Sequence, residues 1–258
     1  MQRIIDFIRF LSNSTNAHGL HSPFMYHLAT RCFYDKKKYA DYALLKVYHK
    51  QLKKDKRLIQ VQDLGAGSKL LSPDVRRVKD IAKVAGSHMA DMKLLYRLSK
   101  YFEPKNVLEL GTSLGKSAFS LTLGNPKATV ITVEGDKNVW EVANAYFKKF
   151  RQQNIQSLLS DFDTYLDELN QTDTQLDMIL LDGNHRLTPT LRYFEKLQKH
   201  IHNDTIIIVD DIYWSAEMKQ AWQQLTQHPS VRQSVDTYRF GMLFFRKEQF
   251  KQKFVIRL

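Results

Sequence analysis

The sequence has little of what marks a secreted or membrane protein. Its 258 residues contain one cysteine, Cys32, which excludes an internal disulfide and favours a reducing compartment. No apolar run approaches the length of about 18 residues that a membrane span requires. Arg3, Asp6 and Arg9 interrupt the apolar positions at the start of the chain, unlike a signal peptide. These absences predict a soluble cytoplasmic protein.

Glutamate is absent from the first hundred residues. They hold 20 Lys and Arg against 8 Asp, whereas residues 101–258 hold 19 basic and 19 acidic side chains, so the whole excess of +12 lies in the N-terminal segment. Such asymmetry predicts attraction to nucleic acid, an anionic membrane surface or an acidic substrate. Aromatic residues that could stack on bases lie within it: Phe33, Tyr34, Tyr39, Tyr42 and Tyr48. The alternative is a basic helical cap with an aromatic core.

Apolar spacing predicts helices in this segment at residues 4–11, 23–34 and 41–52, and a longer one at residues 80–101. We therefore expect two parts, a basic helical cap at 1–85 and a catalytic domain at 86–258. His18 and His21 lie in a polar loop without a third nearby metal ligand, so a loop or gate role is expected. A second glycine turn within residues 61–79 lacks the apolar helix and strand of a nucleotide-binding unit, and it is interpreted as a mobile basic segment.

Only ten glycines are present, and two of them, Gly111 and Gly115, form the most informative motif. They follow an apolar strand that starts at Asn106 and precede a short helix that starts at Ser117. A second strand ends on Glu134, where an acid can accept hydrogen bonds from a ribose diol. A dinucleotide site needs a further glycine, and a phosphate-binding P-loop needs one more residue, so both are disfavoured.

The remaining pattern, Glu109-Leu-Gly-Thr-Ser-Leu-Gly115, resembles motif I of class I S-adenosylmethionine (SAM) dependent methyltransferases. The resemblance covers residues 106–245. It implies a Rossmann-like α/β fold with a seven-stranded, mostly parallel sheet that an antiparallel strand pair closes, preceded by the basic helical cap. It also implies SAM as the cofactor, bound by Glu109, Gly111, Ser113, Gly115, Ser117, Glu134, Asp161, Phe162 and Asp182.

Within that family, the acids after the fourth and fifth strands look most like the catechol and macrolide-sugar O-methyltransferases. There a carboxylate and an Asp-Asn or Asp-Asp pair hold a divalent cation. The resemblance implies Mg²⁺ or another divalent cation on Asp182, Asp210 and Asp211, although Asp211 stands where the catechol group has Asn. The alternative is that these acids bind the cofactor or cap the next helix.

Asp182 and His185 are the candidate catalytic residues. His185 follows the fourth strand, and an imidazole is suited to act as general base near neutral pH. Its alternative role is to orient Asp182 or to pack under the following helix.

We therefore expect a SAM-dependent O-methyltransferase that acts on a small-molecule hydroxyl, with two copies associating as a possible homodimer. One alternative is methylation of RNA or another polyanion, for which the basic segment is the argument. The other is a non-catalytic binding module built on the SAM fold.

Overall fold

A computed structural model describes residues 2–62, 74–84 and 87–258. Its contacts divide the chain into two compact units, one of residues 1–34 with 166–258 and one of residues 35–165. The expected domain boundary between residues 85 and 86 lies outside the described residues, as does most of the expected basic segment at 61–79, and both stay predictions. None of the described helices combines the length and apolarity that a bilayer crossing needs.

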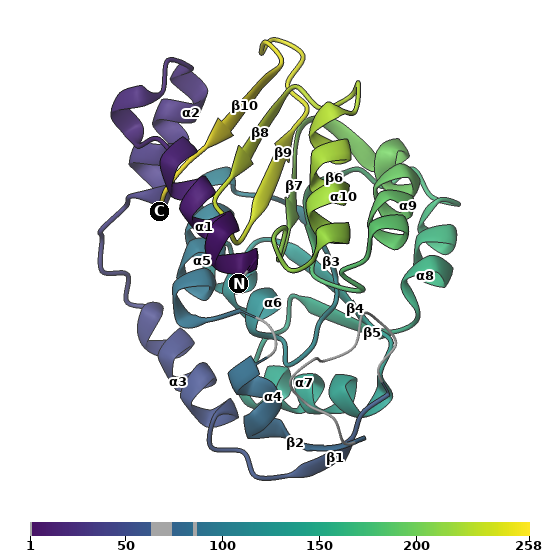
Figure 1. The fold of residues 1–258 in the computed structure, drawn as a ribbon. Coiled ribbons are helices and arrows are strands. Elements are labelled where there is room, and N and C mark those ends of the chain that lie inside the picture. Colours follow the sequence, from purple (N-terminus) through teal and green to yellow (C-terminus); the bar gives the residue numbers. More distant parts are fainter. Residues whose placement is uncertain (1, 63–73, 85–86) are drawn as a thin grey trace. The chain divides into compact units, whose positions relative to one another are not determined.

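The unit of residues 35–165 contains three parallel strands, ordered β3-β4-β5. Central strand β4 is flanked by β3 and β5, and the helices between them make this a βαβ arrangement (Figure 1). A separate antiparallel pair, β1 and β2, precedes them. The elements are α3 (Tyr42–Leu52), β1 (Leu58–Gln60), β2 (Val75–Arg77), α4 (Val78–Val84), α5 (Met89–Phe102), β3 (Asn106–Leu110), α6 (Lys116–Gly124), β4 (Thr129–Glu134), α7 (Lys137–Lys149), β5 (Ile155–Leu159) and α8 (Phe162–Leu169), which contains the unit boundary.

The other unit contains strands in the order β10-β8-β9-β7-β6. Strand β9 is antiparallel to both β7 and β8, which confirms the expected closing pair, and β10 adds a parallel neighbour to β8 that the sequence did not predict. Helices α9 and α10 lie side by side next to these strands (Figure 1). The elements are α1 (Gln2–Asn13), η1 (Ala17–Gly19), α2 (Pro23–Leu28), η2 (Ala29–Phe33), β6 (Leu176–Leu181), α9 (Leu187–Leu197), η3 (Gln198–His200), β7 (Ile201–Val209), α10 (Ala216–Gln227), β8 (Gln233–Asp236), β9 (Gly241–Phe244) and β10 (Gln252–Val255).

The expected helix at 80–101 is two helices, α4 and α5. Before α5, the backbone N–H of His88 donates to the Asp91 carboxylate at 2.9 Å, which satisfies a donor at the helix start and fixes a new N-terminus there. The periodicity continues across the break because both helices bury apolar side chains. Spacing of apolar residues therefore predicted both helices but not the interruption.

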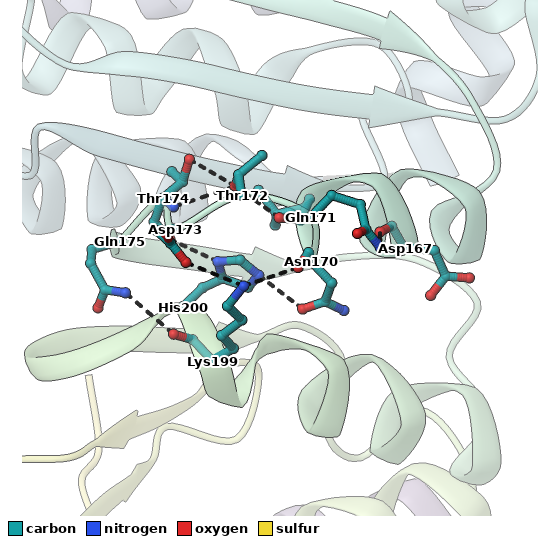
Figure 2. Close-up of polar contacts among 10 residues, drawn as sticks. Asp167, Asn170, Gln171, Thr172, Asp173, Thr174, Gln175, Lys199 and His200 are labelled. Carbon is teal, nitrogen blue, oxygen red and sulfur yellow. Dashed lines mark hydrogen bonds and ion pairs between the residues drawn. The ribbon is translucent and has the colours of Figure 1, made fainter.

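A buried histidine secures the start of β6, as Figure 2 shows. His200 is fully buried, with Nδ1 at 2.7 Å from the Thr174 carbonyl oxygen and Nε2 at 3.0 Å from the Asn170 side chain. Lys199 donates to the Asn170 carbonyl at 3.0 Å and faces Asp173 at 3.3 Å. These contacts fix the loop that leads into β6, and His200 therefore has a structural role.

The aromatic residues of the basic segment are mainly packing residues. Tyr48 is fully buried on α3, stacks on Phe119 with ring centroids 4.2 Å apart, and donates its hydroxyl to the Leu114 carbonyl at 2.9 Å. Tyr39 and Tyr42 form an edge-to-face cluster with Tyr96. This favours the interpretation of an aromatic core and disfavours a surface on which bases stack.

Gly115 is required by both conformation and space. Its φ of 69° is unfavourable for other residues, and an added Cβ would lie 2.4 Å from Phe147 and 2.9 Å from the Tyr48 hydroxyl. We expect Gly115→Ala to lower the free energy of unfolding by about 2–4 kcal/mol, as strain and overpacking add. Denaturant unfolding measures the change.

Glu103 provides the control of opposite sign. It is exposed and has a φ of 47° at the C-terminus of α5, so Glu103→Gly is expected to raise the free energy of unfolding by about 0.5–1 kcal/mol. Equal effects of the two substitutions would contradict the steric argument for Gly115.

Candidate functional site

The glycine turn after β3 has the backbone that the motif predicted. Gly111, Ser113 and Gly115 all have positive φ, at 109°, 47° and 69°. Gly111 N–H donates to the Val133 carbonyl at 3.0 Å, which joins the turn to β4. The turn is thus a fixed loop on which α6 begins at Lys116.

Lys116 explains why the Gly-Lys-Ser sequence is not a P-loop. Its side chain is 2% exposed and donates from Nζ to the Ala82 carbonyl of α4 at 3.1 Å. The ammonium group therefore supports α4 and does not lie over the loop as a phosphate ligand would require. This agrees with the exclusion drawn from the motif length.

Glu134 ends β4 and connects two loops. One oxygen accepts from the Ser113 N–H at 2.8 Å and the other from the Asp136 N–H at 3.0 Å. Burial raises the pKa of its carboxyl, while these backbone donors oppose the increase. The carboxylate therefore fixes the glycine turn against the loop where the ribose of a nucleotide is expected.

Glu109 lies on β3 and is fully buried. Thr132 donates to its Oε2 at 2.5 Å, whereas Oε1 has no hydrogen-bond partner among the described residues. Burial raises the pKa of Glu109 to about 7, although the Ser117 and Thr132 hydroxyls oppose this by stabilising the charged form. Glu109 is therefore a carboxylate enclosed behind the turn, which solvent does not reach.

Asp161 lies at the start of α8. It is exposed and caps α8, accepting from the Thr164 N–H at 2.9 Å and its hydroxyl at 2.5 Å. These bonds lower the pKa of the Asp161 carboxyl. Phe162, half-buried, is the first residue of α8. Helix capping accounts for Asp161, and its expected contact with adenine stays a prediction.

The unit of residues 1–34 and 166–258 holds the other candidate residues, where β6 and β7 end. Asp182 Oδ1 lies 3.7 Å from His185 Nε2, with the side chains 8% and 23% exposed. Asp210 and Asp211 follow β7, and the Asp210 side chain is nearly inaccessible. Asp182 and His185 are three residues apart in the loop after β6, which accounts for their proximity, and their catalytic roles stay predictions.

Strained backbone gathers at these strand ends. The residues with positive φ are Asn184 at 65°, His185 at 28°, Asp211 at 52° and Tyr238 at 69°, and none is glycine. Such conformations cost about 1–3 kcal/mol each and cluster at functional sites, because the surrounding structure holds them for a purpose other than stability. The strain therefore supports a site at the ends of β6, β7 and β8.

The sequence analysis did not identify Arg239 as a candidate site residue. It lies in the connection between β8 and β9, and its guanidinium faces Asp210, with Nε 3.4 Å from Oδ1, and Asp211, with NH1 3.9 Å from Oδ1. Burial raises the pKa of Asp211, and the charge of Asp210 raises it further, while Arg239, His185 and Arg3 oppose the increase. The sequence pattern around a single arginine between two strands does not indicate an ion pair, because its acidic partners lie far away in the sequence.

The N-terminal helix contributes to the same edge. The Arg3 guanidinium lies 4.2 Å above the Trp214 ring and donates to the Trp214 carbonyl at 3.2 Å. The Tyr238 hydroxyl donates to the Arg3 carbonyl at 3.0 Å, and the Tyr238 ring stacks on Tyr213. Helix α1 therefore covers the loops that follow β7 and β8.

The expected metal ligands do not form a metal centre. Among the described residues, no three His, Cys, Asp or Glu side chains are grouped so that they could hold a metal ion, and this includes His18 and His21. Magnesium requires close octahedral oxygen ligands at about 2.0–2.1 Å. Asp210 and Asp211 instead face the Arg239 cation, so the residues present do not fit a divalent ion.

The model of a family described as a methyltransferase domain matches residues 108–212. Solved structures show the same fold. The SAH-bound methyltransferase PaMTH1 of Podospora anserina matches with a TM-score of 0.62 and 14% identity, covering 88% of this chain and 97% of that chain. An O-methyltransferase of Bacillus cereus in complex with SAH gives 0.55 and 16%, covering 86% and 96%. TomG of Streptomyces achromogenes, an O-methyltransferase involved in tomaymycin synthesis and solved with SAM, gives 0.56 and 15%, covering 81% and 91%. The expected class I methyltransferase fold is confirmed.

Protonation of Glu109 gives a pH-dependent prediction. Its pKa of about 7 in the folded protein lies above the ordinary value of 4.5, so the folded state binds the proton more tightly than the unfolded state. The contribution of Glu109 to the free energy of unfolding should therefore fall by about 3 kcal/mol as pH rises from about 4.5 to 7. In Glu109→Gln this decrease should be much smaller, as urea unfolding across that range would show.

Glu141→Gln on the exposed face of α7 is the matched control, and it should keep the wild-type pH dependence. A parallel pH dependence in Glu109→Gln and the wild type would contradict the assignment of the proton to Glu109.

Proposed function

Given a methyltransferase domain at residues 108–212, we propose that the protein transfers a methyl group from SAM to a hydroxyl oxygen of a small molecule. The observation that carries this proposal is the Glu134 carboxylate fixed against the glycine turn, at the place where a nucleoside diol is bound in this fold. The SAH- or SAM-bound O-methyltransferases of the same fold support the reaction class.

The residues of the turn fit the cofactor. SAM supplies a methyl group activated by an adjacent sulfonium. We assign the binding of the ribose hydroxyls to Glu134. The positive φ of Gly111 lets the backbone of the turn pass close to the cofactor. Glu109 is fully buried, so we assign it to supporting the turn from behind, where the Thr132 hydroxyl donates to its carboxylate. Gly115, Ser117 and Ser113 complete the turn, while Asp161 and Phe162 are proposed to lie beside the adenine.

The chemistry at the acceptor is a displacement at carbon. The hydroxyl oxygen forms a bond to the methyl carbon while the carbon–sulfur bond breaks, and its electron pair stays on sulfur. We assign the hydroxyl proton to His185, whose imidazole is 23% exposed, and the resulting positive charge is stabilised by Asp182 at 3.7 Å. The enzyme contributes chiefly by holding the oxygen and the methyl group in line.

The cofactor assignment is tested by calorimetry with SAM. The wild type should bind SAM in preference to NAD and ATP. Glu134→Gln should bind SAM at least about tenfold more weakly, because the loss of a charged acceptor for the ribose hydroxyls removes about 1.4 kcal/mol or more. Glu141→Gln, an exposed Glu on the neighbouring helix, is the matched control and should bind like the wild type.

Preference for NAD or ATP, or wild-type affinity in Glu134→Gln, would overturn the cofactor site. Turnover is then measured by transfer of labelled methyl to a panel of phenols and other alcohols. A non-catalytic binding module would bind SAM and label no acceptor.

Methylation of RNA is the second candidate, and its support is the basic N-terminal segment. A groove of about 470 Å³ within the unit of residues 35–165 is lined by the cations Lys54, Arg57 and Lys149. Arg57, however, is paired with Asp55 at 2.6 Å, and the aromatic residue of the lining, Tyr146, is 6% exposed, which disfavours stacking of bases there. The small-molecule reading is therefore preferred.

RNA binding separates the two candidates. At about 0.15 M salt we expect single-stranded RNA to bind no more tightly than about 1 µM, the range of non-specific contacts. Fluorescence anisotropy across a salt series measures this. Tighter binding that is weakened by Lys54→Glu with Lys149→Glu, at unchanged SAM affinity, would promote the RNA candidate. Association of two copies stays a prediction of the sequence.

A further inference from the structure

The acidic pair after β7 already has a cation. Arg239 donates from NH2 to Asp210 Oδ2 at 3.4 Å. Its Nε lies 3.4 Å from Asp210 Oδ1 in an ion pair without a hydrogen bond, and its NH1 lies 3.9 Å from Asp211 Oδ1. The Asp210 side chain is 2% exposed, so this carboxylate is removed from water and needs a positive partner. Arg239 supplies that charge from the protein itself.

The connection that carries Arg239 is held in place on both sides. Tyr238 N–H donates to Asp236 Oδ1 at 2.7 Å, and Thr237 N–H donates to the Phe240 carbonyl at 2.9 Å. The Tyr238 ring stacks on Tyr213 with centroids 4.8 Å apart, and Tyr213 in turn donates to Asp236 at 2.7 Å. These contacts fix the backbone at Arg239, including the positive φ of Tyr238. The position of the Arg239 guanidinium is therefore fixed by the connection between β8 and β9.

Asp210 and Asp211 already face positive charge from the protein itself. Two guanidinium groups, Arg239 and Arg3, oppose the two carboxylates Asp210 and Asp211. Arg3 is itself held by Trp214. A divalent cation on the same carboxylates would have to displace Arg239 and would meet its repulsion.

We propose that Arg239 takes the place of a divalent cation at the acceptor site and that methyl transfer by this protein is independent of metal. This inference rests on the proposed function. A guanidinium is a fixed hydrogen-bond donor, and unlike a metal ion it offers no pair of open coordination positions. The acceptor therefore does not need two neighbouring hydroxyls that chelate a metal, and a molecule with a single hydroxyl is a sufficient substrate.

Mn²⁺ binding tests the proposal without a methyl acceptor. It is measured by the loss of the free-ion signal in electron paramagnetic resonance. We expect the wild type to bind Mn²⁺ with a Kd of about 1 mM or weaker. Protein and metal at about 100 µM each should therefore show no stoichiometric binding. Arg239→Met removes the competing charge and should gain an Mn²⁺ site at least tenfold tighter. Arg239→Met with Asp210→Asn should lose it again.

Two controls keep the outcomes distinct. Arg239→Lys retains the charge and should exclude Mn²⁺ as the wild type does. SAM affinity, measured in every variant, reports both folding and the proposed function, because the proposed SAM contacts do not include Arg239. If Arg239→Met does not fold, the comparison of wild type, Arg239→Lys and Asp210→Asn decides.

Stoichiometric Mn²⁺ binding by the wild type that Asp210→Asn abolishes would overturn the proposal. So would methyl transfer that stops in a chelator and returns on addition of Mg²⁺. Absence of SAM binding in the wild type would instead overturn the proposed function and leave the Mn²⁺ result as a separate measurement.

Discussion

The carboxylate of Glu134 is the interaction on which the candidate cofactor site depends. It accepts backbone donors from the glycine turn and from the loop before α7, so it joins the end of β3 to the end of β4. Ser113 adopts a left-handed conformation at this contact, and its N–H is directed to the carboxylate. Among the described residues the donors to this carboxylate are backbone N–H groups, and burial raises the pKa of Glu134 because it disfavours the charged form. Ligand hydroxyls would add the donors that this carboxylate has room to accept.

The acids at the strand ends have unequal roles, although one pattern in the sequence suggested them all. Asp161 caps a helix, Asp182 faces His185, and Asp210 pairs with Arg239. Parallel strands bring their carboxyl ends to one edge, which is why acids there are typical of ligand sites. The same position is also the start of the next helix, where an acid is stabilising without any ligand. Position alone therefore cannot separate the two roles.

Local patterns were sufficient to predict much of the fold. The strands β3, β4, β6 and β7 are short apolar runs ended by glycine or acid, and the expected antiparallel pair appears as β8 and β9. Strand β10 was missed because it has only four residues, Gln-Lys-Phe-Val, in which polar and apolar side chains do not alternate. The role of Arg239 could not be predicted, because an ion pair between residues 29 positions apart depends on how two connections meet. Long-range electrostatic partners are a property of the folded chain.

Tyr48 links the basic N-terminal segment to the catalytic motif in a way that constrains how the two can change. Its ring fills the space between Phe119 and Phe150, and its hydroxyl satisfies the Leu114 carbonyl inside the glycine turn. A smaller residue would leave both a cavity and an unpaired buried acceptor. Substitutions at Tyr48 would therefore be tolerated only together with changes around the turn. In the evolution of this protein, helix α3 and motif I would be inherited as a single unit.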